Sequence, residues 1–314
     1  MKSPGDRILI IGPAWVGDMV MSHSLYRVLA DTRPGAIIDV LAPAWSQPLL
    51  ARMPEVRQGL TKRIDHGELA LGRRRKLGRV LRDGYDQAIV LPNSIKAALV
   101  PMLARIPRRT GWRGEMRYGL LNDMRRLDSE ALPLMVQRFV ALGLEPGTAL
   151  PDPLPPPRLT VDSVRAAACA QRFGLDPDRK LLVLCPGAEF GGAKRWPSEH
   201  YAALADEYLG RGWQVALFGS ARDSEVTGAI LDGASGQGIH DLAGSTSLAD
   251  AIDLMSLAGA VVSNDSGLMH IAAALDRPLL VIYGATSPGF TPPLSSRATT
   301  LVSDIDCAPC FERE

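Results

Sequence analysis

The sequence predicts an α/β protein built from two doubly wound, parallel-sheet domains. Its 314 residues are 46% apolar and 22% charged, which is enough material for two ordinary hydrophobic cores. Short apolar runs alternate with stretches of helical periodicity along both halves, as expected of parallel sheets covered by helices. Five prolines crowd into residues 151–157, a density that no helix or central strand tolerates. We therefore expect a linker there, with domains over residues 1–157 and 158–314.

The first half opens with a strand, a glycine-containing loop, an amphipathic helix and a second strand. That order is typical of the start of a doubly wound sheet. The predicted segments are strand 7–11, helix 19–30, strand 36–41, an arginine-rich helix over about 67–83, strand 87–91 and a strand near 107–110.

The second half repeats the alternation more regularly. Pro197 suits the first position of a helix, because its fixed φ angle and missing N–H cost nothing there. The predicted strands are 181–185, 213–218, 260–263 and 279–283, and the helices begin at Pro197 or span 223–232, 247–258 and 267–275. Ligands are expected at the carboxyl ends of the strands and in the cleft between the domains.

Charge is distributed unevenly along the chain. The total is only +1, so no overall field recruits nucleic acid. Residues 1–157 nevertheless carry a net charge of +8, and residues 158–314 carry −7. The basic half suits an anionic partner, although basic side chains that simply solvate helix faces explain the charge equally well.

Cysteine usage and the termini indicate a cytoplasmic protein. Four cysteines in a chain of this length are typical of reduced, intracellular proteins. The apolar run after the N-terminus is four residues long, too short for a signal peptide, and the longest charge-free stretch is broken by prolines. We therefore expect no membrane-spanning segment.

The loop Gly12–Asp18 (GPAWVGD) is the first candidate site. Backbone amides and the positive end of a helix gather where a strand gives way to a helix. Ala14 and Trp15 occupy the place of the close-approach glycine of a G-x-G-x-x-G fingerprint, which argues against a dinucleotide. Asp18 is either an N-cap, which spacing alone favours, or a general base in the cleft.

Three loops of the second half suit a nucleoside diphosphate. Pro186–Pro197 (PGAEFGGAKRWP) combines three glycines with Lys194 and Arg195, which favours phosphate oxygens over a plain loop with surface cations. Ser263–His270 (SNDSGLMH) places small polar residues and a glycine at a helix start, another anion-type arrangement. Gly219–Glu225 is weaker, because its acidic residues either accept ribose hydroxyls or simply favour a helix N-terminus.

Metal and cofactor signatures are weak. Asp176–Asp178 and Asp304–Asp306 are D-x-D strings away from the glycine loops, and Cys307–Cys310 is a C-x-x-C without a second pair of ligands. The sequence therefore predicts neither a metal site nor a cofactor.

The basic half has two concentrations of arginine. Arg75, Arg79 and Arg82 fall on one face of the predicted helix. A second group between Arg105 and Arg117 is interleaved with Trp112 and Tyr118, which suits a sugar ring carrying phosphate or carboxylate. RNA also fits that group, but the acidic second half argues against an extended nucleic-acid footprint, and no nucleic-acid partner is expected.

These loops together resemble the bacterial ADP-heptose:lipopolysaccharide heptosyltransferases of glycosyltransferase family 9, most closely the heptosyltransferase II members. The matching stretches follow one order over nearly the whole chain, which is more specific than any single loop. They are GPAWVGDMVMSHSLYRVLA (12–30), APAWSQPLLARMPEV (42–56), LPNSIKAALVP (91–101), RTGWRGEMRYGLLND (109–123), CPGAEFGGAKRWP (185–197), NDSGLMHIAAAL (264–275) and YGATSPGFTPPLS (283–295).

The resemblance implies a GT-B fold of two Rossmann-like domains, an inverting reaction and no required metal or cofactor. The donor would be ADP-L-glycero-D-manno-heptose, and the acceptor heptosyl-Kdo2-lipid A, reached by peripheral contact with the cytosolic face of the inner membrane. Relatives continue past the position of Glu314 into a C-terminal helix, so a further helix is expected beyond this sequence.

The resemblance also assigns roles to residues. It makes Asp18 the base and Lys194 the phosphate-binding and catalytic cation, which reverses the capping preference for Asp18. The donor would contact the residues Gly187, Lys194, Ser220, Asp223, Glu225, Asp265, Ser266, Gly267 and His270. The acceptor would contact the residues Trp15, Asn93, Arg113 and Arg117.

The expected reaction is attack of an acceptor heptose hydroxyl on the anomeric carbon of the donor, with Asp18 taking the proton and ADP leaving from the opposite face. Lys194, the helix start at Ser266 and His270 would stabilise the charge on ADP. A heptosyltransferase I acting on Kdo and a non-catalytic nucleotide-binding module remain alternatives. A nicotinamide-dependent oxidoreductase is disfavoured, because its fingerprint and acidic ribose ligand are missing.

Overall fold

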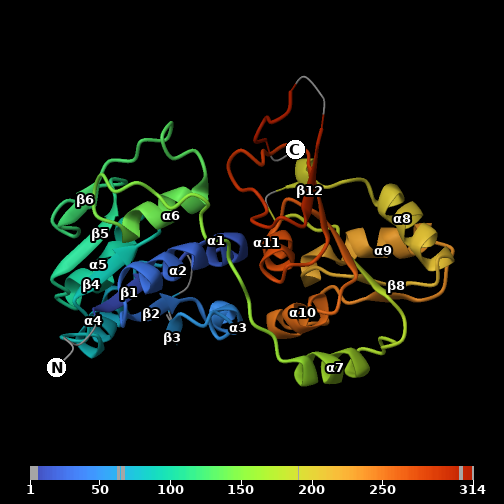
Figure 1. Ribbon diagram of the computed structural model, residues 1–314, viewed down its shortest axis with the longest axis horizontal. Helices are drawn as coiled ribbons and strands as arrows, with labels where there is room; N and C mark the ends of the chain where they lie inside the picture. The colour runs from blue at the N-terminus through green and yellow to red at the C-terminus, as the bar shows by residue number, and fades with distance from the viewer. Residues whose placement is uncertain (1–5, 62–63, 65–67, 190, 304–306, 313–314) are drawn as a thin grey trace. The chain divides into compact units, whose positions relative to one another are not determined.

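The computed structural model describes residues 6–61, 64, 68–189, 191–303 and 307–312. The chain divides into two compact units, Met1–Pro157 and Arg158–Glu314. Each contains a six-stranded, all-parallel sheet flanked by helices, which confirms the predicted α/β class (Figure 1). No helix in the described parts of the chain is long and apolar enough to span a bilayer.

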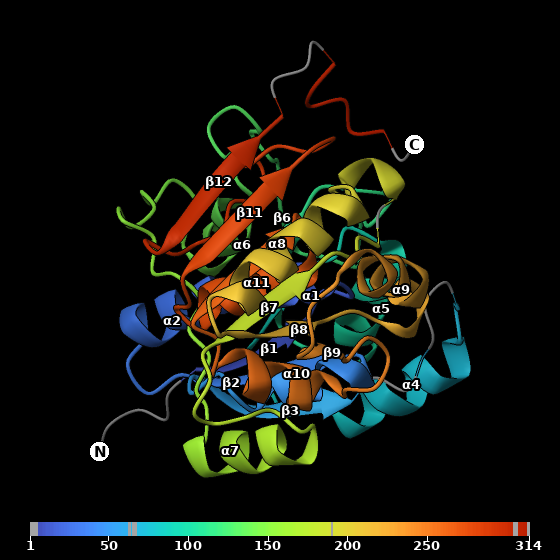
Figure 2. The same ribbon diagram turned by 90° about the vertical axis from the view of Figure 1, so that its right-hand side faces the viewer.

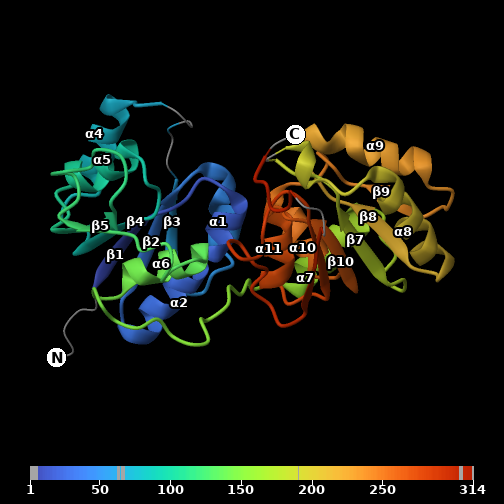
Figure 3. The ribbon, with the colours of Figure 1, turned by 90° about the horizontal axis from the view of Figure 1, so that it is seen from above.

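The first unit has the strand order β3-β2-β1-β4-β5-β6. Its central strand is buried along four of five residues, because both faces of a parallel sheet are covered. Figure 3 shows α4 and α5 on one side of this sheet and α2 and α6 on the other. The elements are β1 (Arg7–Ile11), α1 (Val16–Met21), α2 (His23–Thr32), β2 (Ile37–Ala42), α3 (Gln47–Leu50), β3 (Val56–Thr61), α4 (Leu71–Val80), β4 (Gln87–Val90), α5 (Ile95–Leu103), β5 (Arg108–Trp112), β6 (Asp123–Arg125) and α6 (Met135–Gly143).

The second unit has the order β12-β11-β10-β7-β8-β9, and Figure 2 shows α8 in front of this sheet. One apolar cluster joins α8 and α9 to β7 and β8, while α7 and α10 pack together. The elements are α7 (Ser163–Arg172), β7 (Leu181–Cys185), α8 (Ser198–Gly210), β8 (Gln214–Leu217), α9 (Ser224–Gly233), β9 (Ile239–Asp241), α10 (Leu248–Met255), β10 (Ala260–Asn264), α11 (Gly267–Ala274), β11 (Leu279–Tyr283) and β12 (Ala298–Val302).

Three predicted boundaries are wrong. The helix expected over 19–30 is two helices, because the chain turns at Ser22 between α1 and α2. The arginine-rich helix ends at Val80, so Arg82 lies beyond it rather than on its face. Pro197 precedes α8 as its N-cap instead of opening it.

Candidate functional site

In each sheet the strand order reverses at one place: successive strands along the chain are added first on one side of a central strand and then on the other. In the first unit β1 and β4 are neighbours, but β1 leads outward to β2 while β4 leads the other way to β5. In the second unit β7 and β10 stand in the same relation. The loops that leave two such strands diverge, and the gap at their carboxyl ends is where doubly wound folds bind ligands.

A pocket of about 490 Å³ occupies this place in the first unit. The loop after β1 contributes Trp15 and Asp18, and the loop after β4 contributes Asn93. Trp112 at the end of β5 and Arg138 of α6 complete the wall. The structure therefore brings three of the predicted site residues together around one cavity.

Asp18 is one of two acidic residues that line this pocket, the other being Glu115. It is the third residue of α1, whose N-cap is Trp15, so the carboxylate is not the cap that spacing favoured. Burial raises the pKa of the Asp18 carboxyl from 3.8 to about 6, because the charged form is poorly solvated there. A carboxylate with that pKa is still ionised at neutral pH and is a stronger base than an exposed aspartate.

The two predicted acceptor arginines differ. Arg113 is exposed, but it is not among the residues that line the pocket in the described chain. Arg117 is 0% exposed, and its guanidinium donates to the carbonyl oxygens of Pro92 and Trp112 and to Asn93 Oδ1. Arg117 is therefore enclosed and holds two walls of the pocket together, and its expected contact with the acceptor stays a prediction.

Lys194 and Asp265 meet at the switch point of the second unit. Lys194 Nζ lies 2.7 Å from Asp265 Oδ2, and the hydroxyl of Thr286 donates to the same oxygen at 2.6 Å. All three side chains are mostly buried. The ammonium thus stands at the carboxyl end of β10, held by a carboxylate that directly follows the strand.

Asn264 fastens the loop that carries Lys194. Its Nδ2 donates to the carbonyl of Pro186 at 2.7 Å, and its Oδ1 accepts from the Trp196 amide and the Tyr201 hydroxyl. Neither Asn264 nor Thr286 was singled out from the sequence. An asparagine at the end of an apolar run is a sequence pattern that could have identified Asn264. No comparable pattern marks Thr286.

The loop after β8 is closed on itself. Asp223 Oδ2 accepts from the amide and the hydroxyl of Ser220 in a capping box, so this carboxylate is used at a helix start. A Cβ on Gly187 would lie 2.5 Å from Asp223 Oδ1, which explains why a glycine stands there. Glu225 is exposed in the first turn of α9.

The start of α11 presents Ser266 and Gly267, both partly exposed, while His270 is buried one turn later. Burial lowers the pKa of His270 to about 4, so its imidazole is neutral at physiological pH. The prediction that His270 helps to stabilise a leaving diphosphate therefore rests on a neutral imidazole, which could contribute an N–H donor but no positive charge.

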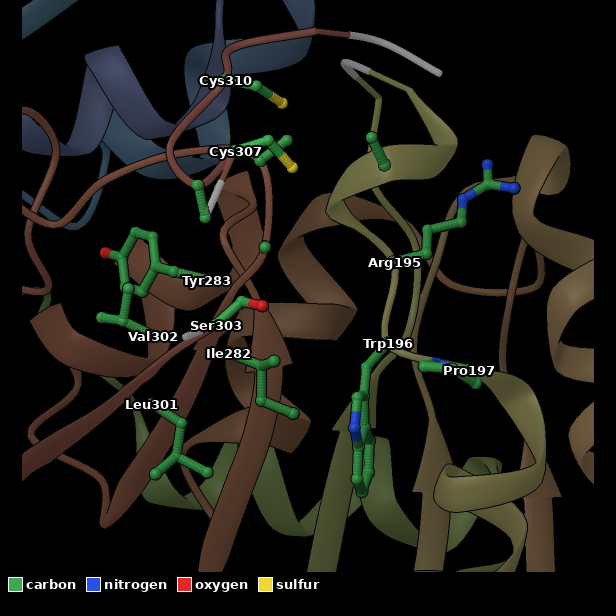
Figure 4. Close-up of a pocket in the computed structure, with 14 residues that line it drawn as sticks. Arg195, Trp196, Pro197, Ile282, Tyr283, Leu301, Val302, Ser303, Cys307 and Cys310 are labelled. Carbon is green, nitrogen blue, oxygen red and sulfur yellow. The ribbon is translucent and has the colours of Figure 1, made fainter. Parts of the chain in front are cut away.

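The second unit has a cavity of about 550 Å³ that adjoins the loop carrying Lys194 (Figure 4). Cys307 and Cys310 lie at one end of it, and Leu301 and Trp196 at the other. Both cysteines are exposed free thiols. Among the described residues, no three His, Cys, Asp or Glu side chains gather as metal ligands, and Asp304–Asp306 lies outside those residues.

Comparisons with known proteins point to one family. The family model described as glycosyltransferase family 9 (heptosyltransferase) matches residues 74–314. Lipopolysaccharide heptosyltransferase 2 of Salmonella typhimurium is 54% identical over 94% of this chain and 87% of its own length. Lipopolysaccharide heptosyltransferase 1 of Pseudomonas aeruginosa is 30% identical over 98% of this chain and 86% of its own. The solved structure of Escherichia coli ADP-heptose lps heptosyltransferase II matches with a TM-score of 0.89, at 50% identity, over 97% of this chain and 96% of that one.

Proposed function

Because the chain belongs to glycosyltransferase family 9, the heptosyltransferases, we propose that it transfers L-glycero-D-manno-heptose from ADP-heptose to the first heptose of heptosyl-Kdo2-lipid A. The chain is a glycosyltransferase with the GT-B fold of that family. The higher identity to a heptosyltransferase 2, 54% against 30% for a heptosyltransferase 1, supports the second heptose of the inner core as the product.

One observation supports the chemistry: the carboxyl group of Asp18, whose pKa burial raises to about 6, lines the pocket at the switch point of the first unit. In the proposed reaction Asp18 accepts the proton of the acceptor hydroxyl as that oxygen attacks the anomeric carbon. The bond from that carbon to the diphosphate breaks on the opposite face, which inverts the configuration. The acceptor sugar binds beside Trp15 and Asn93.

The leaving ADP gains negative charge, and the second unit supplies the groups that offset it. Lys194 is paired with Asp265, two residues before α11 begins, and the backbone amides at Ser266 and Gly267 add the positive end of that helix. Gly187 and the Ser220–Glu225 loop are the proposed contacts of the nucleoside. When the diphosphate binds, Lys194 either leaves Asp265 or contacts that carboxylate and the diphosphate together.

The acceptor is anchored in a membrane, so we also propose peripheral contact with the cytosolic face of the inner membrane. The net charge of +8 on residues 1–157 supports attraction to anionic lipid.

Single-turnover transfer tests the proposal. ADP-heptose is mixed with two soluble acceptors, one that ends in Kdo and one that already carries the first heptose. We expect product only on the second acceptor, and a rate about 10² to 10⁴ times lower for Asp18→Asn with unchanged ADP affinity. Product on the Kdo acceptor would assign heptosyltransferase I, and ADP binding without any transfer would assign a non-catalytic module.

A further inference from the structure

Residues 69–82 are strongly basic. They contain six lysines and arginines and no carboxylate. Helix α4 covers Leu71–Val80 of this segment, and Arg82 follows it. Like charges on neighbouring turns of a helix repel one another, so the directions in which these six side chains point affect the stability of the segment.

The cations of α4 point in two directions. Arg74 faces inward, with 2% of its surface exposed, and its guanidinium donates to the carbonyl oxygens of Glu68, Leu69 and Lys96. Arg73 forms an ion pair with Glu68 at the helix start.

The outward-facing cations are Arg75, Lys76 and Arg79, and all three are exposed. They lie three and four residues apart, so they share one face of the helix. Within the parts of the chain that the structure describes, no carboxylate forms an ion pair with any of them. This face therefore presents three exposed positive charges to its surroundings.

Apolar side chains flank these charges. Val80 is 74% exposed and Leu71 is 39% exposed, one at each end of α4. We call Leu71, Arg75, Lys76, Arg79 and Val80 the basic face of α4. Exposed cations beside exposed aliphatic groups suit an interface at which phosphate groups lie next to hydrocarbon.

The basic face is tied to the Asp18 pocket. The Arg74 guanidinium bonds to the first turn of α5, and a Cβ on Gly78 would meet Leu103 at 2.8 Å, so the two helices pack closely. They lie side by side in Figure 3. Helix α5 begins at Ile95, directly after Asn93 and Ser94, which line the pocket. A surface that holds α4 is therefore held at a fixed position relative to that pocket.

We propose that the basic face of α4 docks on an anionic lipid bilayer and presents the pocket of the first unit to the membrane-anchored acceptor. This inference rests on the proposed function, because it takes the acceptor to be a lipid. Attraction to anionic headgroups is worth about a fivefold gain in partitioning for each cation.

Sedimentation with vesicles tests the docking without using catalysis. The full chain is mixed with vesicles of phosphatidylcholine alone or of phosphatidylcholine with phosphatidylglycerol. We expect binding only to the second, weakened by added salt, and about 100-fold weaker for the triple variant Arg75→Gln, Lys76→Gln, Arg79→Gln. The matched control removes three exposed cations of the second unit, Arg172→Gln, Lys180→Gln, Arg211→Gln, and should bind as the parent does.

A transfer assay separates the two proposals. The α4 variant should lose transfer to acceptor embedded in anionic vesicles while keeping the parental rate on soluble, truncated acceptor. Absence of transfer by the parent on both acceptors would overturn the proposed function and leave the vesicle result standing. Vesicle binding that the α4 variant retains, binding to neutral vesicles, or retention of the parent by single-stranded RNA in place of vesicles would overturn the docking proposal.

Discussion

Lys194 and Asp265 form a buried ion pair with 2.7 Å between Nζ and Oδ2. The pair joins the loop that follows β7 to the residue after β10. It therefore bridges the two strands between which the strand order of the second sheet reverses. A buried ammonium that already has one carboxylate partner is held in place before a ligand arrives, which lowers the entropy cost of binding an anion.

Replacing Lys194 with Gln should weaken donor binding. Loss of a charge-assisted hydrogen bond typically costs about 1.5 to 3 kcal/mol, so we expect the Kd for ADP-heptose to rise by about 10- to 100-fold. Calorimetric titration measures this. Lys180→Gln, an exposed lysine of the same unit, is the control. Unchanged donor affinity in the Lys194 variant would remove Lys194 from the site.

The pH dependence of transfer should report Asp18. Because the base must be ionised, kcat/KM should fall tenfold per pH unit below about pH 6, the raised pKa of this carboxyl. If the base were an exposed aspartate, the fall in kcat/KM would instead begin near pH 4. Rates measured from pH 4.5 to 8 with the soluble acceptor locate it. A fall that begins near pH 4 would contradict the role of Asp18.

Asp18→Asn should stabilise the protein at neutral pH even though it removes activity. The folded-state pKa is about 6 and the unfolded value about 3.8, so the folded state binds more protons between them and loses stability as the pH rises through that window. The cost above pH 6 is about 3 kcal/mol at most. Thermal unfolding at pH 4 and pH 8 should show the variant's advantage only at pH 8. A lower melting temperature for the variant at pH 8 would refute this origin of the shift.

Arg117 and Arg113 should affect different properties. Arg117→Met leaves buried carbonyl oxygens without their donor, so we expect a loss of about 2 to 4 kcal/mol and a melting temperature several degrees lower. Arg113→Glu changes an exposed side chain, and it should raise the acceptor KM with the donor KM and the melting temperature unchanged. If Arg113→Glu changes both KM values equally, Arg113 does not belong to the acceptor side.

The strands that the sequence pattern identified are those inside each sheet. Strand β7, for instance, is buried at every residue and reads as a continuous apolar run. The edge strands β3, β6, β9 and β12 were not predicted. β12 (ATTLV) illustrates why: four of its five residues are exposed, and its two threonines interrupt the continuous apolar run that marks an inner strand.

In the candidate site, too, the sequence pattern indicated some features and missed others. Loop composition marked the loops that contain Asp18 and Lys194 as candidates, because strand-to-helix loops with glycines and charge have a recognisable pattern. The proposed role of Asp18 as a base was favoured only by the family resemblance. Loop composition could not reveal that Arg117 is enclosed or that Thr286 contacts Asp265, since both facts depend on segments that are distant in the sequence. Nor could spacing show that Trp15, not Asp18, is the N-cap of α1. Local pattern thus predicts which loops matter, and packing decides what each side chain does.

Trp15 gives the pocket of the first unit a built-in optical probe. Its indole is 57% exposed at the wall that Asp18 shares, whereas Trp112 in the same pocket is almost fully enclosed. A sugar that covers Trp15 would move its fluorescence toward shorter wavelength. Occupancy of the acceptor side can therefore be followed in real time on the unlabelled protein, independently of turnover.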